Sequence, residues 1–249
     1  MSDMKIEDYL AQGGKLSNPS NVPARYRAEL MRLMATFVDS ELAGAAGFAD
    51  VINAGPGIKE RIAAAKIVLE KTDNADKVLT IMGDFGANTA KYATHHPWTD
   101  RLARDADIGT ARNDADMRLA VFNYPLEGWA DAVVMNLLMG LAVGVQLDEF
   151  ARVSYAPLAD AFRAIAPVEA RHAELATEGL ERLDDAPLQA SVDYWWPRVA
   201  ASFGKDISTR ASQLQAFGLR HSTNAELREE WEATAAQALE NLGLNAPKG

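Results

Sequence analysis

The sequence contains no cysteine among its 249 residues. This absence excludes disulfide bonds, thiolate metal sites, cysteine nucleophiles and iron–sulfur clusters. Basic residues are also scarce, because 25 Lys and Arg stand against 35 Asp and Glu, giving a net charge of −10. That surplus of negative charge argues against binding to nucleic acid or to an anionic membrane, since both require a cationic protein face.

Targeting and membrane-spanning segments are missing as well. Residues 1–5 lack the basic and then apolar pattern of a signal peptide. No run of about 18 uncharged apolar residues occurs, and the longest mainly apolar run, residues 132–145, has the length of a buried core helix. We therefore expect a cytoplasmic protein. Dinucleotide, Walker and nucleophile-elbow motifs are also absent, so no bound NAD or flavin is expected.

The apolar residues recur at helical spacing, and no hairpin signal interrupts them. This pattern predicts an all-α fold with an N-terminal arm over residues 1–24 and a single domain over residues 25–249. A four-helix bundle with a long crossover accounts for the spacing. The expected core helices cover residues 24–53, 58–82, 125–152 and 156–183, and a C-terminal extension with further helices covers residues 185–249. The apolar side of the second helix is expected at Ile62, Ala65, Leu69 and Val78.

Acidic residues on these helices suggest a metal site. Di-iron carboxylate bundles take one Glu from each of two helices and a Glu-x-x-His from each of the other two, because residues i and i+3 share a helix face. The fourth helix has one complete copy, Glu169 and His172. The first helix offers Glu41 on its apolar stripe, and the third offers Glu127. The second offers Glu70, with Asp73 where the pattern requires His.

The heights of these residues along the bundle support a shared site only in part. Glu41 and Glu70 lie equally far from the Gly-Pro-Gly turn at residues 55–57, as antiparallel neighbours at one height should. Glu127 and Glu169 fit less well, since their midpoint falls short of the bend at residues 152–154. Each carboxylate alone would by default be a surface charge. The joint pattern, with one acid on each helix, favours a metal site.

Several longer segments extend this pattern and resemble a known family. They are Ala65-Lys66 before Glu70, Phe122-Asn123-Tyr124-Pro125 followed by Glu127, Trp129, Ala130 and Asp131, Ser154-Tyr155-Ala156-Pro157 before Glu169, Trp195-Trp196-Pro197-Arg198 with Phe203-Gly204, and Asn224-Ala225-Glu226-Leu227-Arg228. In these segments the chain resembles the catalytic A-type subunits of the ring-1,2-phenylacetyl-CoA epoxidases, the phenylacetate-CoA oxygenase family. The resemblance covers most of the chain.

The resemblance implies a ferritin-like bundle that activates oxygen at a carboxylate-bridged di-iron centre and inserts an oxygen atom into the ring of an aryl-CoA thioester. It also implies electrons from a separate reductase and an oligomer that includes a homologous scaffold subunit. The family's ligands carry over to Glu41, Glu70, Glu127, Glu169 and His172. Asp73 departs from the pattern, because the family has His there.

This departure leaves the metal and the activity open. Four ionised Glu balance two divalent metals, and a ligating Asp73 would add a negative charge that favours harder ions such as manganese over iron. Asp131, four residues after Glu127, is either a partner that orients a ligand or an exposed acid. Our first hypothesis is an oxygenase subunit that uses two iron ions. The alternative is a structural or regulatory subunit with a degenerate metal site, and a storage or oxidase bundle is a third.

No residue of a substrate pocket is assigned by these patterns. The phosphates of coenzyme A nevertheless require a local group of Lys and Arg side chains, despite the acidic total charge. We therefore expect such a group beside the cleft of the bundle.

Overall fold

The computed structural model describes residues 5–90, 92, 97–111, 116–183, 188–205 and 209–247. These residues form α-helices joined by turns and short 3-10 segments, and their one isolated bridge joins Leu16 to Tyr155. The all-α prediction is confirmed. The helices are α1 (Ile6–Ala11), α2 (Ala24–Val51), α3 (Ile58–Asp84), α5 (Gly128–Phe150), α6 (Ala156–Leu180), α7 (Leu188–Ala200), α8 (Thr209–Ala216) and α9 (Asn224–Asn241).

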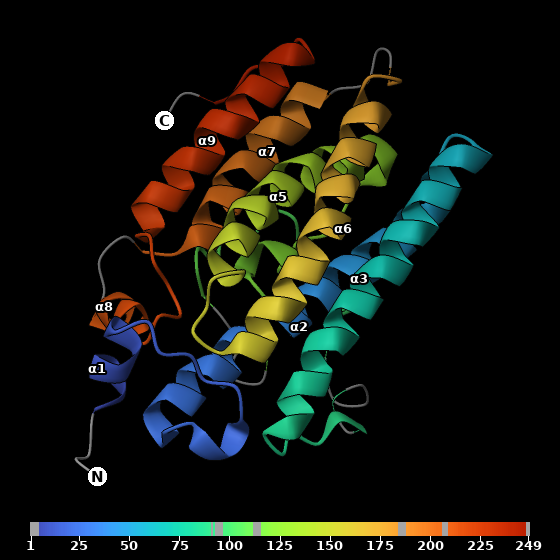
Figure 1. Cartoon of the computed structure of the whole chain (residues 1–249). Helices are drawn as coiled ribbons and strands as arrows, with labels where there is room; N and C mark the ends of the chain where they lie inside the picture. The colour runs from blue at the N-terminus through green and yellow to red at the C-terminus, as the bar shows by residue number, and fades with distance from the viewer. Residues whose placement is uncertain are drawn as a thin grey trace.

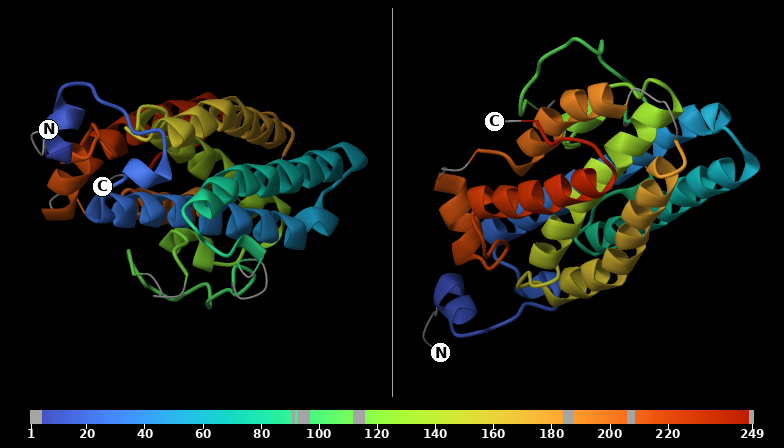
Figure 2. Two further views of the ribbon diagram at one scale, coloured as in Figure 1. Left: turned by 60° about the horizontal axis from the view of Figure 1, so that its bottom comes forward. Right: turned by 90° about the horizontal axis from the view of Figure 1, so that it is seen from above.

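Four long helices make the bundle as two antiparallel hairpins, α2–α3 and α5–α6 (Figure 1). α3 packs beside α6, and α2 contacts α5. The chain between the hairpins passes along one side of the bundle (Figure 2). Several hydrogen bonds hold it against α2, among them those in which the Met117 amide donates to Asp39 and the Leu119 amide donates to Ser40. Because α3 packs against both α2 and α6, side chains from these three helices meet in the centre of the bundle.

α5 lies at the heart of the molecule. Its length and composition alone would allow it to cross a membrane, but 72% of that segment is buried by other parts of the chain. α7 and α9 pack against it on the side away from α2 (Figure 1). Trp195 on α7 and Trp231 on α9 are fully buried there, and the Trp231 indole donates to the Leu138 carbonyl. α5 is thus a core helix whose apolar surface is covered by protein.

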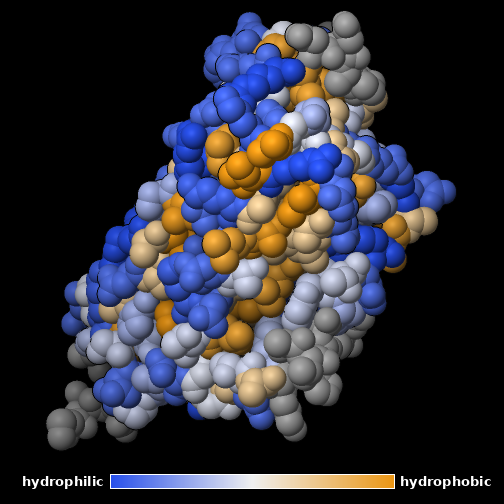
Figure 3. Space-filling view, turned by 90° about the vertical axis from the view of Figure 1, so that its right-hand side faces the viewer, coloured by the Kyte–Doolittle hydropathy of each residue, from blue (hydrophilic) through white to orange (hydrophobic). Residues whose placement is uncertain are grey.

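The orientation of α3 differs from the expectation. Val78 is buried as predicted, but Ile62 and Leu69 are 62% and 68% exposed and Ala65 is exposed as well, so the prediction of a buried apolar side was wrong for these three residues. Figure 3 shows this side of the molecule, where hydrophobic side chains lie among charged ones. The inward face instead carries small and polar residues as well as apolar ones, Ala64, Ile67, Lys71, Asn74, Ala75 and Val78 among them. This orientation turns Lys71 and Asn74 toward the bundle centre.

Candidate functional site

A buried polar cluster lies where α2, α3 and α6 meet. We call it the Lys71 cluster, and its members are Glu41 from α2, Lys71 and Asn74 from α3, and Glu169 and His172 from α6. Each of these residues is 6% exposed or less. Burial of charged and polar side chains is costly unless they are paired with one another, so their interactions define what this site can do.

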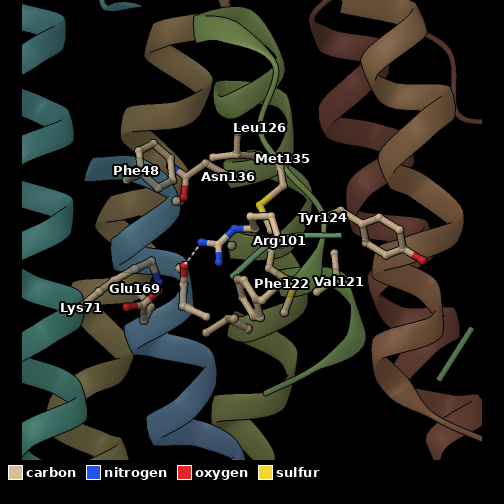
Figure 4. A pocket seen from close by; sticks show the side chains of 16 residues that line it. Phe48, Lys71, Arg101, Val121, Phe122, Tyr124, Leu126, Met135, Asn136 and Glu169 are labelled. Carbon is tan, nitrogen blue, oxygen red and sulfur yellow. Dashed lines mark hydrogen bonds and ion pairs between the residues drawn. The ribbon is translucent and has the colours of Figure 1, made fainter. Parts of the chain in front are cut away.

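The Lys71 ammonium group joins two of the helices facing α3. Its Nζ atom lies 2.8 Å from Glu169 Oε2 and 3.3 Å from Glu41 Oε1. A Cβ atom at Gly44 would be in ordinary contact with Lys71 Cδ, at 3.6 Å, and in a tighter contact with the Phe122 ring, at 3.3 Å. Figure 4 shows Lys71 and Glu169 together beside the small cavity that they help to line. A protein cation thus sits between two buried carboxylates.

The rest of the cluster is only partly satisfied. The Asn74 amide donates to Glu169 Oε1 at 2.9 Å, and His172 Nε2 lies 2.8 Å from Glu70 Oε2. His172 Nδ1 lies 3.3 Å from Glu169 Oε1 but makes no hydrogen bond to any described residue. Glu41 Oε2 and Asn74 Oδ1 likewise find no hydrogen-bond partner in the part of the chain that the structure describes. Buried polar atoms without partners are uncommon in folded proteins, so three in one cluster indicate a site adapted to more than stability.

Burial and proximity displace the pKa values of the three charged groups in this cluster. Burial raises the pKa of Glu41 to about 8, the negative charge of Glu169 adds to that effect, and Lys71 offsets it only in part. Burial acts to raise the pKa of Glu169 too, but Lys71 and His172 outweigh it and hold that pKa well below its usual range. Burial likewise opposes the charge on Lys71, but the two carboxylates raise its pKa. The ammonium and the Glu169 carboxylate are therefore the charged pair.

Three of the six expected ligands are not members of the cluster: Glu70 borders it through His172, and Asp73 and Glu127 lie away from it. The Asp73 side chain is 65% exposed and pairs with Lys77 on the outer side of α3. The Glu127 side chain is 61% exposed, and Glu127 Oε2 lies 3.0 Å from Arg104 Nε. We expected Glu127 within the first turn of a helix, but it precedes α5, and Gly128 follows it with φ of +86°, a conformation that glycine adopts readily. This turn leaves the Glu127 side chain outside the bundle.

The residues present do not fit a di-metal centre. Where α5 faces the cavity of about 30 Å³ beside the cluster, it contributes Asn136, Met139 and Gly140 and no carboxylate. Within the described part of the chain, no group of three or more His, Asp or Glu side chains is arranged to hold a metal ion. Lys71 also contacts both carboxylates that a metal would need. Glu41, Glu70, Glu169 and His172 come together as the helical spacing suggested, but around an ammonium group.

Asp131, considered above as a partner of a metal ligand, lies in a separate ion pair. Its two carboxylate oxygens accept hydrogen bonds from the two terminal nitrogens of Arg104, at 2.9 and 2.7 Å. The Trp195 indole and the Glu127 amide also donate to it, each at 2.9 Å. Burial acts to raise the pKa of Asp131, but these donors together lower it. We call Asp131, Arg104 and Trp195 the Arg104 cluster.

A larger cavity of about 320 Å³ begins at Glu41 and runs away from the cluster. Apolar side chains from α2, α5 and α8 line it, among them Leu33, Phe37, Val143, Leu147, Phe150 and Leu214. Lys205, Arg210 and Arg220 bring positive charge to it, and Lys205 is exposed. Arg210 is paired with Glu29, so Lys205 and Arg220 are the basic side chains left for a ligand here, and a basic group for coenzyme A phosphates stays a prediction. An apolar pocket with a few polar groups is the usual form of a small-molecule site.

Arg220 stands out among these cations. Its guanidinium donates to the neutral side chains of Gln146, at 2.7 Å, and Asn224, at 3.2 Å. Glu149 acts on it electrostatically without forming an ion pair, and burial lowers the pKa of Arg220. Since arginine remains charged in proteins, this cavity wall carries a cation that forms no ion pair with a carboxylate among the residues that the structure describes. Such a group favours an anionic ligand.

Sequence reasoning missed Lys71, Asn74, Arg104 and Arg220. One signal was available for the first two: Ile67, Lys71, Asn74 and Val78 recur at steps of four, three and four, which is the spacing of one helix face. A second helical face, with Ile62, Ala65 and Leu69, is more apolar and was therefore predicted to be the buried one. Asp131 is 27 residues from Arg104, and Gln146 is 74 residues from Arg220, so no local pattern indicated either contact.

The helical bundle and its carboxylate–histidine residues define a class, the ferritin-like helical proteins, here with a lysine in the polar centre. Residues 4–249 match the model of the family described as phenylacetic acid catabolic protein. The chain belongs to this family. It is also 26% identical over 253 residues to the A-type subunit of the 1,2-phenylacetyl-CoA epoxidase of Escherichia coli (strain K12), in an alignment covering 98% of this chain and 76% of that protein.

Proposed function

We propose that this chain is a companion subunit of a multicomponent aryl-CoA oxygenase system and does not itself activate oxygen. The observation that carries the proposal is the Lys71 ammonium group, which contacts both Glu41 and Glu169 in the bundle centre. The outward positions of Asp73 and Glu127 support it, because a di-iron bundle site needs ligands from all four helices. The name of the E. coli relative, which is one subunit of a phenylacetyl-CoA epoxidase, supports the multicomponent setting.

The large cavity offers a binding site for a ligand. We propose that it binds an aryl-CoA thioester, with the acyl part among the apolar side chains near Phe37 and the phosphates near Lys205, Arg210 and Arg220. The chain would then hold or deliver the thioester for a metal-bearing partner protein, to which a separate reductase supplies electrons. In this role its own residues bind and orient the ligand and exclude water from the acyl end.

An oxygen-activating role is the second candidate. The observation that favours it is the proximity of Glu41, Glu169, His172 and Glu70, all of which match the family's ligands in type. Metal binding in such a protein would require Lys71 to leave the space between the two carboxylates. The two candidates therefore differ in the metal content of the purified wild-type chain.

Metal analysis of the wild-type protein separates the two candidates. The protein is purified from cells grown with added iron and with added manganese, and then exposed to Fe(II) without oxygen. We expect less than stoichiometric metal in every preparation and no oxygen consumption with a reductase and phenylacetyl-CoA. About two tightly held equivalents, as a two-metal bundle site requires, together with oxygen consumption, would establish the oxygenase instead.

Calorimetric titration tests the ligand. We expect phenylacetyl-CoA to bind more tightly than either coenzyme A or phenylacetate, since only the thioester fills both the apolar and the cationic parts of the cavity. Arg220→Gln should weaken binding about 10-fold or more, because charged hydrogen bonds to the ligand are lost. Arg171→Gln is the control, since Arg171 lies on the surface of α6 with Glu174 and Glu178. Equal affinity in both variants would contradict this assignment of the cavity.

A further inference from the structure

One buried carboxylate on α5 lies behind the wall of the large cavity and belongs to neither cluster. Glu149 is 1% exposed and is not among the side chains that line the cavity. Its Oε2 atom accepts hydrogen bonds from the amides of His221, at 2.7 Å, and Ser222, at 3.3 Å, and its Oε1 atom accepts one from the Ser222 hydroxyl at 2.8 Å. These donors directly follow Arg220, the cation of the cavity wall. Glu149 therefore holds the backbone next to this cation.

We propose that Glu149 is a positioning residue for the anionic part of the ligand, because it fixes residues 221–222 and so keeps the Arg220 guanidinium in the wall of the large cavity. The proposal rests on the proposed function, in which Arg220 lies near the phosphates of an aryl-CoA thioester. It goes beyond that function by giving a role in binding to a buried residue that does not itself reach the ligand. Glu149 acts on the thioester only through Arg220.

The segment around Arg220 is fixed on both sides of that residue. Before it, the Ser154 amide donates to the Gly218 carbonyl at 2.9 Å, and after it the backbone donates to Glu149. The Arg220 side chain itself donates to Gln146, which lies about one helical turn before Glu149 on α5. A long side chain loses rotamer freedom when a ligand orders it, and this loss weakens binding. An arginine that is already held in place avoids part of that cost.

The charge on Glu149 makes positioning distinguishable from simple electrostatics. Burial acts to raise the pKa of this carboxyl group, but the His221 amide, the Ser222 hydroxyl and amide, and the Arg152 guanidinium together lower it. Hydrogen bonds to an ionised carboxylate are stronger than those to a neutral acceptor. Loss of these bonds frees Arg220 and should weaken the binding of an anion. Loss of the negative charge alone would strengthen it, so the sign of the measured change decides between the two roles.

The test is a double-mutant cycle measured by calorimetric titration with phenylacetyl-CoA. It compares the wild type, Glu149→Gln, Arg220→Gln and the variant with both changes, and melting temperatures show that each protein is folded. Asp148→Asn is the matched control, since Asp148 precedes Glu149 on α5, carries the same charge and is exposed. Glu149→Asp serves where the glutamine variant folds poorly, because it keeps the charge but is one methylene too short to hold its donors. Phenylacetate is titrated as a ligand without phosphates.

We expect the Glu149 variants to bind phenylacetyl-CoA about 5-fold more weakly, the cost of ordering one long side chain, with the binding of phenylacetate unchanged. Asp148→Asn should match the wild type. In the Arg220→Gln background, Glu149→Gln should have almost no further effect, because residues that act through one another are not additive. Unchanged or tighter binding by folded Glu149 variants, or an equal loss in both backgrounds, would overturn the inference and leave the proposed ligand intact. A wild type that does not bind phenylacetyl-CoA would instead refute the proposed ligand and this inference with it.

Discussion

Two buried clusters in this protein each contain an ion pair, and they differ in how completely their polar atoms are used. In the Arg104 cluster, Asp131 accepts hydrogen bonds from two nitrogens of Arg104, from the Trp195 indole and from a backbone amide. In the Lys71 cluster, one oxygen of Glu41, the oxygen of Asn74 and one nitrogen of His172 have no hydrogen-bond partner among the described residues. The first cluster is complete, whereas the second still has unused donors and acceptors.

The comparison separates a structural ion pair from a site that retains the means to bind something else. A buried ion pair that only stabilises a fold needs its remaining lone pairs satisfied, because unsatisfied polar atoms are costly. The Arg104 cluster meets this requirement and joins the crossover, α5 and α7. The Lys71 cluster fails it while retaining residues of the types that bind metals in related bundles. Incomplete pairing of this kind distinguishes the Lys71 cluster from a purely structural ion pair.

The largest expected effect comes from breaking the complete cluster. Asp131→Asn should destabilise the protein by about 3–5 kcal/mol, because the amide cannot balance the Arg104 charge and presents hydrogens to some of the present donors. Urea unfolding monitored by tryptophan fluorescence measures this change, since Trp195 belongs to the cluster. Glu127→Gln is the control: Glu127 is exposed and Asp131 keeps Arg104 in place, so about 0.5 kcal/mol or less is expected. A mild effect of Asp131→Asn would remove the distinction between the two clusters.

A smaller effect is expected from the pH dependence of the incomplete cluster. The pKa of Glu41 is raised to about 8, so between its usual value and pH 8 the folded protein holds a proton that the unfolded chain has released. Stability should therefore be full below that window and fall as the pH rises through it. We expect a loss of about 2 kcal/mol between pH 5 and pH 8, less than the full shift implies because Glu169 and Lys71 share the charge.

Glu41→Gln isolates this contribution, because glutamine fills the same space and does not titrate. Urea unfolding at pH 5, 6, 7 and 8 should show a flatter stability profile for the variant than for the wild type. Glu169 does not interfere, since its pKa is lowered and its stabilisation is lost only on the acid side, below the usual range of a glutamate. Parallel profiles for the two proteins would show that Glu41 is not the group that titrates.

The sequence allowed the fold to be predicted more fully than the site. A long helix can be predicted from the apolar spacing within its own segment. The helices α2 and α6 begin and end within three residues of the expected positions. Glu41 and Glu169 were assigned to the bundle interior because Glu41 shares a stripe with Phe37 and because Glu169 pairs with His172 at helical spacing. These inferences needed only the geometry of a single helix.

What failed was the rotation of α3 and the entry into α5. The outer face of α3 carries Ile62 and Leu69, whereas its inner face carries Lys71 and Asn74, so hydrophobicity pointed to the wrong side. Only a polar partner on another helix makes an inward lysine favourable, and that partner, Glu169, is 98 residues away in the chain. Glu127 was predicted to lie in the helix, but α5 begins one residue later, at Gly128, where the backbone turns.

The smallest expected effect concerns Asp73, the position at which the family's histidine is missing. Asp73→His should change stability by about 0.5 kcal/mol or less, since it breaks only an exposed pair with Lys77. It should add no Mn²⁺ to the wild-type background, because the side chain points away from His172 and Lys71 still contacts both carboxylates. A gain of metal from Asp73→His alone would mean that α3 rotates on binding and that the missing histidine, more than the lysine, keeps the centre empty of metal.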